Sequence, residues 1–189
     1  RDELIASFDL SRVQKGSAIF DEVKLFSVNQ HWMRTLSDVD FLKNLEVECP
    51  TTIVPLLKER AKTFQEAREM LSGELSFFFT EPKLDKDRLL MKEPAADRSG
   101  IAVSALQGFL EPVQALPEDV PADAVKSALM PFADAEEAKG KGGRGAVLWP
   151  LRYALSGQER SPDPFTLISI LGKEEAISRI QKAIAILGG

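Results

Sequence analysis

The chain has 189 residues, 44% hydrophobic and 28% charged, so it is long enough to bury a core as one large domain or two small ones. Its net charge of −5 argues against indiscriminate nucleic-acid binding but allows a local basic site. A single cysteine and a single histidine exclude an internal disulfide framework and a typical structural zinc site.

The length of the apolar runs and the cysteine usage predict the compartment of the protein, and its first residue bears on whether the chain is a fragment. No apolar run approaches the length of a membrane span, and the lone cysteine fits a reducing environment. We therefore expect a cytoplasmic protein without membrane contact. Because the chain begins with Arg1 instead of methionine, we expect a processed product or a fragment of a longer protein.

The first 36 residues predict two helices joined by a polar connection. Residues 1–8 predict a short helix, and Asp21 is the expected N-cap of the longer helix that follows. An apolar ridge runs along this second helix through Leu25, Val28, Trp32 and Leu36. Polar side chains that we expect to face solvent or a partner are Lys24, Gln30, His31 and Arg34.

More helices are predicted up to residue 139. One begins at residue 37 or 38 and another at residue 51 or 52. Thr63 followed by Glu66 has the capping-box pattern, so a third begins there. Residues 76–79 predict an apolar plug in the core, and residues 81–98 predict a loop with one short helix. Residues 99–115 and 120–139 predict two helices interrupted or bounded by prolines.

Residues 140–172 combine glycines, basic residues and two helical segments. The first segment tolerates Pro150 only if it starts close to that proline, where no ladder bond is lost. The second is expected to begin with Asp163 as N-cap and to end at Gly172. From residue 139 to residue 160 there are five basic residues against one acidic residue. An amphipathic helix with isoleucines at steps of three and four closes the chain.

Helical spacing places Trp149, Arg152, Tyr153 and Ser156 on one face of the first segment. An arginine between two aromatic rings is a suitable surface for an unstacked base, because guanidinium planes and aromatic rings both stack on bases. The alternative is that the aromatic rings belong to the core and the arginine is a solvated neighbour.

Catalytic and nucleotide-binding motifs are absent from the sequence. There is no HExxH, GxSxG or CxxC pattern, and the glycine-rich stretch lacks the preceding strand and the Lys-Ser/Thr pair of a phosphate loop. No segment alternates convincingly with period two. We predict an all-α fold, a helical bundle or cage in two packed groups with no significant sheet, that acts as a binding module.

Two sets of motifs, in the right order, resemble bacterial glutamyl-tRNA synthetases. The C-terminal set comprises Pro150-Leu151-Arg152, Ala154-Leu155-Ser156-Gly157, Ser161-Pro162, Phe165 and Leu171-Gly172-Lys173-Glu174. The N-terminal set comprises Phe20-Asp21, Lys24-Leu25 and Asn29. The resemblance covers residues 1 to about 70 and 140–189, and residues 75–138 add little to it.

This resemblance implies roles for particular residues. In the family, the arginine of the first motif and the hydroxyl residue before the proline contact anticodon bases, which implies Arg152 and Ser161 here, with Pro162 shaping the corner. Arg60 is a candidate for a second base-contacting arginine. We also assign two further residues to the expected anticodon site: Trp149 because it belongs to the stacking surface, and Arg144 because it belongs to the basic stretch. Residues implied near the inner elbow of the tRNA are Lys24, Asn29 and Arg34.

The resemblance also implies an activity for the parent enzyme. Such enzymes join glutamate to tRNA with ATP and Mg²⁺, through an adenylate made in a Rossmann-type domain whose signatures are absent here. We expect residues 1–70 to form a stem-contact and linking region and residues 71–189 the anticodon-binding domain. The expected partner is tRNA(Glu), bound by a monomer without DNA binding, metal site or cofactor in this chain.

Two other interpretations stay open at the level of sequence. The chain could be a tRNA-binding protein in its own right, or part of a related synthetase with another specificity. It could also be a helical protein-interaction module without any role in RNA binding.

Overall fold

The computed structural model describes residues 1–13, 16–17, 19–90, 98–138 and 143–188. Throughout these ranges every regular element is an α-helix or a 3₁₀-helix, and none is a strand. The prediction of an all-α fold is therefore confirmed. None of the described helices is both long and apolar enough to cross a lipid bilayer.

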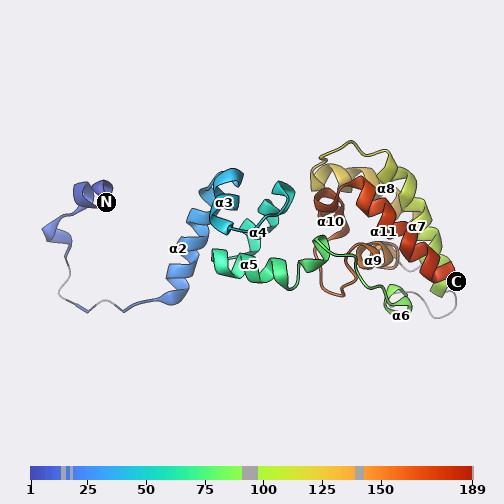
Figure 1. Ribbon diagram of the computed structural model, residues 1–189, viewed down its shortest axis with the longest axis horizontal. Helices are drawn as coiled ribbons and strands as arrows, with labels where there is room; N and C mark the ends of the chain where they lie inside the picture. Colours follow the sequence, from blue (N-terminus) through green and yellow to red (C-terminus); the bar gives the residue numbers. More distant parts are fainter. Residues whose placement is uncertain (14–15, 18, 91–97, 139–142, 189) are drawn as a thin grey trace.

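The first group of helices follows an N-terminal arm. The arm holds α1 (Asp2–Ser7) and the 3₁₀-helix η1 (Leu10–Arg12), and it extends away from the other helices (Figure 1). The group itself comprises α2 (Glu22–Thr35), α3 (Asp38–Leu45), η2 (Thr51–Ile53), α4 (Val54–Arg60) and α5 (Phe64–Ser72).

Side-chain caps begin the helices of this group where the sequence predicts them. Asp21, Ser37 and Thr63 each accept a hydrogen bond from the backbone N–H three residues later. The Thr63 box differs in one respect, because Glu66 accepts from the backbone N–H of Lys62 at 2.7 Å instead of that of Thr63. This bond still pins the connection between α4 and α5.

The second group is built around one central helix. It comprises η3 (Ser76–Phe78), α6 (Lys86–Leu89), α7 (Arg98–Gln114), α8 (Ala122–Ala138), α9 (Gly143–Ser156), α10 (Pro164–Leu171) and α11 (Lys173–Gly188). Helices α6, α7, α8, α10 and α11 all contact α9, and Figure 1 shows α9 seen end-on among them. The closing amphipathic helix is confirmed as α11, in which Ile180 and Leu187 are buried.

The start of α9 corrects the expectation for Pro150. The helix begins at Gly143, so Pro150 lies in its interior and cannot donate to the carbonyl one turn earlier. An interior proline costs about 3 kcal/mol, whereas full burial of one large apolar side chain contributes about 1.5–3 kcal/mol. Because Val147, Leu151 and Leu155 are all buried, packing outweighs the loss of one ladder bond.

The apolar ridge of α2 lies on the surface. Trp32 is 65% exposed, and Leu25 and Val28 are each nearly half exposed. On this helix only Met33 is buried. The surface continues along the arm, where the large exposed apolar side chains are Leu4, Ile5, Phe8, Leu10, Val13, Ile19 and Phe20. The arm and α2 therefore present an apolar surface that no described part of the chain covers.

The two groups meet where η2 contacts α10. At this junction the hydroxyl of Thr52 donates to the carbonyl of Ile170 at 3.4 Å. Figure 1 shows the group of α2–α5 on one side of the junction and the group of α7–α11 on the other. The boundary predicted after residue 70 falls in the last turn of α5 and stays a prediction.

Gly108 allows α7 and α8 to pack closely. A Cβ atom at this position would lie 2.0 Å from Cζ of Phe132, which is far inside van der Waals contact. We expect Gly108→Ala to lower the free energy of unfolding by about 1–3 kcal/mol, because the Phe132 ring must move. Urea unfolding followed by circular dichroism measures this change.

Gly145 provides the matched control, because a Cβ atom there meets nothing within 4 Å and φ is not positive. We expect Gly145→Ala to be neutral or to stabilise by up to about 1 kcal/mol. Equal effects of the two substitutions would show that the close contact does not limit the packing of α7 on α8.

Candidate nucleic-acid interface

One glycine and several hydrogen bonds fix the turn between α9 and α10. We call this turn, residues 157–163, the corner. Gly157 ends α9 with φ of +66°, and a Cβ atom there would lie 2.8 Å from Cβ of Pro82, so glycine is needed for both conformation and space. At the other end, Asp163 accepts hydrogen bonds from the N–H groups of Phe165 and Thr166, as predicted. Between them, the hydroxyl oxygens of Ser156 and Ser161 are 3.2 Å apart.

Arg152 lies half-buried on the outer side of α9. Its guanidinium stacks over the Trp149 ring at 4.8 Å, and Nη2 donates to the carbonyl of Glu159 at 2.9 Å. Burial lowers the pKa of Arg152 from its ordinary value, which is high enough that the group stays charged. The Glu159 carboxylate forms an ion pair with Arg88. The guanidinium is therefore oriented by the protein, with part of it left at the surface.

The expectation that Trp149 offers its ring face to a base is wrong. Trp149 is 8% exposed, and its Nε1 donates to the carbonyl of Arg88 at 2.8 Å. Tyr153 is 4% exposed, so the alternative in which the aromatic rings belong to the core holds. Arg152 covers one side of the indole, and a shallow hollow of about 230 Å³ opens beside them.

A groove of about 480 Å³ lies between the two groups of helices. Arg60 lines it from α4, and Ser161 and Pro162 line it from the corner, so the structure brings these three predicted residues together. The remaining lining residues are Thr52, Pro55, Leu56, Glu59, Pro121, Ala122, Asp163, Thr166, Ser169 and Ile170. Arg60 is 38% exposed and lies 3.7 Å from the Glu74 carboxylate, a loose pairing that leaves the guanidinium at the groove.

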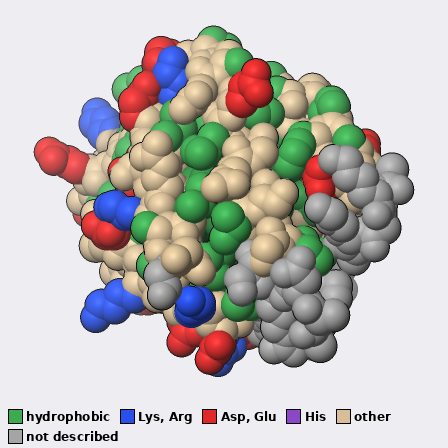
Figure 2. Space-filling view, turned by 90° about the vertical axis from the view of Figure 1, so that its right-hand side faces the viewer, with side chains coloured by type: hydrophobic (Ala, Val, Ile, Leu, Met, Phe, Trp, Pro, Cys, Tyr) green, Lys and Arg blue, Asp and Glu red, His purple; other side chains and the backbone are tan. Residues whose placement is uncertain are grey.

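Arg144 lies apart from this groove and has two acidic partners. Its Nε is 2.8 Å from a carboxylate oxygen of Asp134 and 2.9 Å from one of Glu137. The basic stretch predicted around it is thus partly neutralised, and Lys139 and Lys141 lie outside the described residues. On the face shown in Figure 2, basic side chains lie beside acidic ones and do not gather into a patch.

Two of the three residues expected near the tRNA elbow contact the end of α4. Arg34 donates to the carbonyls of Lys58 and Glu59 at 3.0 Å each, and Asn29 donates to the carbonyl of Lys62. These are carbonyls at or beyond the end of a helix, which lack intrahelical donors. The expectation that Arg34 and Gln30 face solvent or a partner is therefore wrong in part, since Gln30 also donates to Glu59.

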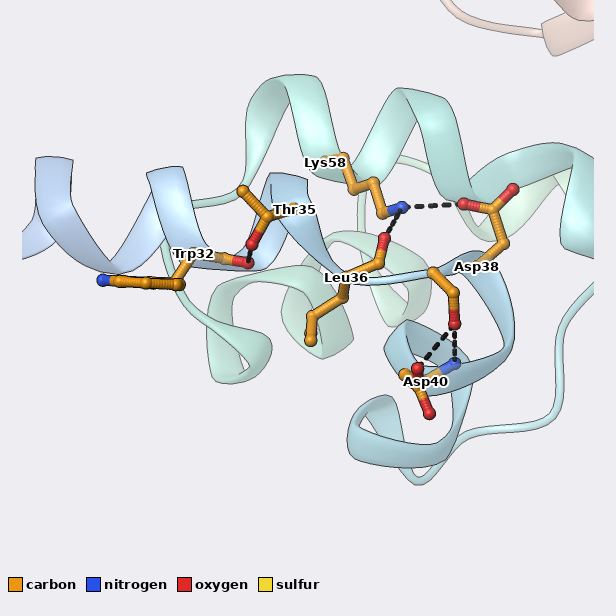
Figure 3. Close-up of polar contacts among 7 residues, drawn as sticks. Trp32, Thr35, Leu36, Asp38, Asp40 and Lys58 are labelled. Atoms are coloured by element: carbon orange, nitrogen blue, oxygen red, sulfur yellow. Dashed lines mark hydrogen bonds and ion pairs between the residues drawn. The ribbon is translucent and has the colours of Figure 1, made fainter. Parts of the chain in front are cut away.

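Lys58 of α4 also contacts the end of α2 and the start of α3 (Figure 3). Its ammonium donates to the carbonyl of Leu36 and to the carboxylate of Asp38, both at 2.7 Å. Lys24, the third residue expected to contact the tRNA, has an exposed side chain beside Ile19 and Leu25. Only Lys24 of the three is without a side-chain bond to α4 or its C-terminal loop among the described residues.

Comparison with known proteins places the chain in a family. Residues 20–184 match the family described as the anticodon binding domain, which is most of the chain. This protein belongs to that family. The match spans both groups of helices and includes the groove between them.

Proteins similar to this chain include glutamate–tRNA ligases. The chain is 30% identical to glutamate–tRNA ligase 1 of Xanthobacter autotrophicus and 32% identical to glutamate–tRNA ligase 1 of Mesorhizobium japonicum. These alignments cover 97% and 96% of this chain and 40% of each relative. A crystal structure of a glutamate tRNA ligase from Elizabethkingia meningosepticum in complex with its amino acid superposes with a TM-score of 0.70 at 31% identity, over 98% of this chain and 36% of that one. The chain thus spans less than half the length of these relatives.

Arg179 is a residue of this anticodon-binding domain that the sequence interpretation missed. It is 3% exposed, donates from Nη1 to the carbonyl of Leu155 at 2.6 Å, and pairs with Glu175 one turn earlier. Nη2 also reaches the carbonyl of Thr80 at 3.4 Å. The sequence signal was an arginine beside the apolar stripe of α11 with a glutamate four residues before it.

Arg34 and Lys24 both lie on α2 but are expected to differ in their contribution to stability. We expect Arg34→Ala to lower the free energy of unfolding by about 1–3 kcal/mol, because two carbonyls of α4 lose a charged donor. Lys24→Ala is the matched control on the same helix and should change stability by less than about 0.5 kcal/mol. Urea unfolding of both variants tests this difference, and an Arg34→Ala protein as stable as the parent would contradict the capping role.

Proposed function

We propose that this chain is the tRNA-binding part of a glutamate–tRNA ligase and that it recognises the anticodon of tRNA(Glu). In this proposal the catalytic part of a longer protein attaches glutamate to the tRNA with ATP and Mg²⁺. The chain alone would bind tRNA without forming glutamyl-tRNA. The observation that carries the proposal is the groove between the two helical groups, which Arg60, Ser161 and Pro162 line together. Arg152 lines a separate hollow beside α9.

The groove suits an unstacked base. Its volume of about 480 Å³ lies in the range of small-molecule sites, and its walls combine apolar side chains with a few polar groups. Anticodon bases are single-stranded and expose their edges, so hydroxyl and guanidinium groups can distinguish among them. At the separate hollow on α9, the half-buried guanidinium of Arg152 already lies over the Trp149 ring, so it can hydrogen-bond to a base with little further ordering.

The apolar surface on the arm and α2 supports membership of a longer protein. Phe20, Leu25 and Val28 line one exposed hollow, and Phe20 is 73% exposed, which is unusual for large apolar side chains on a free-standing domain. The relatives are more than twice as long as the aligned part, so each has further chain that such a surface can contact.

We expect Arg152→Ala to weaken binding of tRNA(Glu) by about 10- to 100-fold, which corresponds to the loss of one base stack. An unrelated tRNA should lose much less, because it shares the phosphates but not the anticodon. Fluorescence anisotropy with labelled transcripts measures both affinities. Equal losses for the two tRNAs would reduce Arg152 to a phosphate contact.

Arg144→Ala is the matched control for Arg152→Ala, since both arginines lie on α9. Because two carboxylates already neutralise Arg144, we expect this substitution to change tRNA(Glu) affinity by less than about threefold. A larger loss with Arg144→Ala than with Arg152→Ala would move the proposed interface to the start of α9.

Salt dependence separates RNA binding from protein binding. We expect the affinity for tRNA(Glu) to fall as salt rises, because each phosphate contact releases counterions. The slope of log affinity against log salt should be shallow, since few of the described basic residues near the groove lack an acidic partner. Affinity that is independent of salt would contradict RNA binding and favour an apolar protein interface.

A further inference from the structure

A cavity of about 300 Å³ lies between α11 and the segment that leads from η3 to α6. Pro82 and Leu84 line it from that segment, Ala154 lines it from α9, and Ala185 and Ile186 line it from α11. Its walls are therefore largely apolar. Its volume lies at the lower end of the range for small-molecule sites, about 300–1,000 Å³. It shares no described lining residue with the groove between the two groups of helices, so it is a separate feature.

Arg179 also lines this cavity, although it is only 3% exposed. A guanidinium has five N–H hydrogens and no acceptor. Nε donates to the carboxylate of Glu175, and Nη1 donates to the carbonyl of Leu155. Nη2 makes a long contact of 3.4 Å with the carbonyl of Thr80. Among the described residues, these three bonds leave two of the five hydrogens without an acceptor.

These two hydrogens favour a ligand that supplies an acceptor. A buried donor that gives up water and gains no acceptor destabilises a protein, and the effect is larger for a charged donor. Nη2 lies beside Thr80, and the next residue, Glu81, belongs to the cavity wall. An oxygen atom that enters the cavity can therefore accept a hydrogen bond from the guanidinium.

The charged groups around the cavity form two ion pairs. Arg179 pairs with Glu175 at 2.7 Å, and Lys182 pairs with Glu81 at 2.8 Å. These four side chains carry no net charge together. A charged ligand would thus lose its hydration without a net attraction to offset the loss. The apolar walls and the balanced charges together favour an uncharged ligand.

We infer that this cavity is a binding site for a small, uncharged and largely apolar molecule that carries one hydrogen-bond acceptor, such as an aromatic ketone. The walls bury the apolar body of the molecule, and Arg179 donates a hydrogen bond to its acceptor. The inference goes beyond the recognition of tRNA, because it does not require that the groove holds a base.

The test titrates acetophenone, which has one aromatic ring and one carbonyl, into the full chain labelled with nitrogen-15. We expect the Nε–H signal of Arg179 and the amide signals of Ala154 and Ala185 to shift along one binding curve in two-dimensional NMR spectra. In α-methylstyrene a methylene group replaces the carbonyl oxygen at nearly the same shape. It should bind about 10- to 100-fold more weakly, the effect of one hydrogen bond to a charged group. Benzoate, of similar size but charged, should also bind more weakly than acetophenone.

Variants locate the binding site in the cavity. Ala185→Phe should reduce acetophenone binding by at least about tenfold, because the ring occupies the cavity, and it should fold because Ala185 is exposed. Ala128→Phe is the matched control, since it makes the same substitution at an exposed alanine of α8 that does not line the cavity. It should bind acetophenone as the parent does. Arg179→Met removes the donors at similar length and should abolish the preference for acetophenone over α-methylstyrene.

The outcomes are independent of the tRNA measurements. Unchanged binding in folded Ala185→Phe overturns the inference, and so does equal affinity of the parent for acetophenone and α-methylstyrene. Tighter binding of benzoate than of acetophenone overturns the assignment of an uncharged ligand. If Arg179→Met does not fold, the comparison of the two probes in the parent and the Ala185→Phe variant still decide. Failure of the proposed function would show in the tRNA affinities and would leave these results unchanged.

Discussion

The packing of α9 among neighbouring helices is the constraint on which the rest of the candidate site depends. Because five other helices contact α9, its axis and its rotation are fixed by the core. Its last residues then occupy defined places, and Arg179 holds the carbonyl of Leu155 from α11. Gly157 turns the chain immediately afterwards and lies close to Pro82. The position of the corner, which contains Ser161, is therefore fixed by the core.

One helical turn of α9 holds both core residues and the arginine to which we assign a role in recognition. Trp149 and Tyr153 are core residues, and the indole N–H is satisfied by the carbonyl of Arg88. Arg152 lies over the indole and is held by the carbonyl of Glu159. The aromatic ring therefore orients the guanidinium and does not stack on a base itself. A side chain ordered in this way loses little conformational entropy when it binds a ligand.

Local sequence signals were sufficient for the starts of α2, α3, α5 and α10. Asp21, Ser37, Thr63 and Asp163 all cap helices, because an N-cap acts through the three residues that follow and needs no tertiary context. The start of α9 was not predictable from Pro150, because the burial that offsets an interior proline comes from helices distant in sequence.

The candidate site was predictable in its residues and not in its geometry. The resemblance pointed to Arg152, Ser161 and Pro162, but it did not show that Arg60 approaches two of them across a groove. Nor did helical spacing show which face of α2 is inward. The polar face contacts the end of α4 because Arg34 and Gln30 satisfy its carbonyls, so the apolar ridge is left outside. Buried Arg179 escaped notice because an arginine in an amphipathic helix usually faces water.

The distribution of charge fits the proposed selectivity of an acidic chain for one RNA. With a net charge of −5, the whole chain repels a polyanion, and Arg144 and Arg60 both have carboxylate neighbours. No described carboxylate pairs with Arg152, whose hydrogen bond goes to a carbonyl. The phosphate term, which all tRNAs share, is therefore small, and base contacts must supply a larger share of the binding energy. Under the proposed function, contacts that depend on the anticodon would decide which tRNA stays bound, because little sequence-independent affinity is available to hold a wrong one.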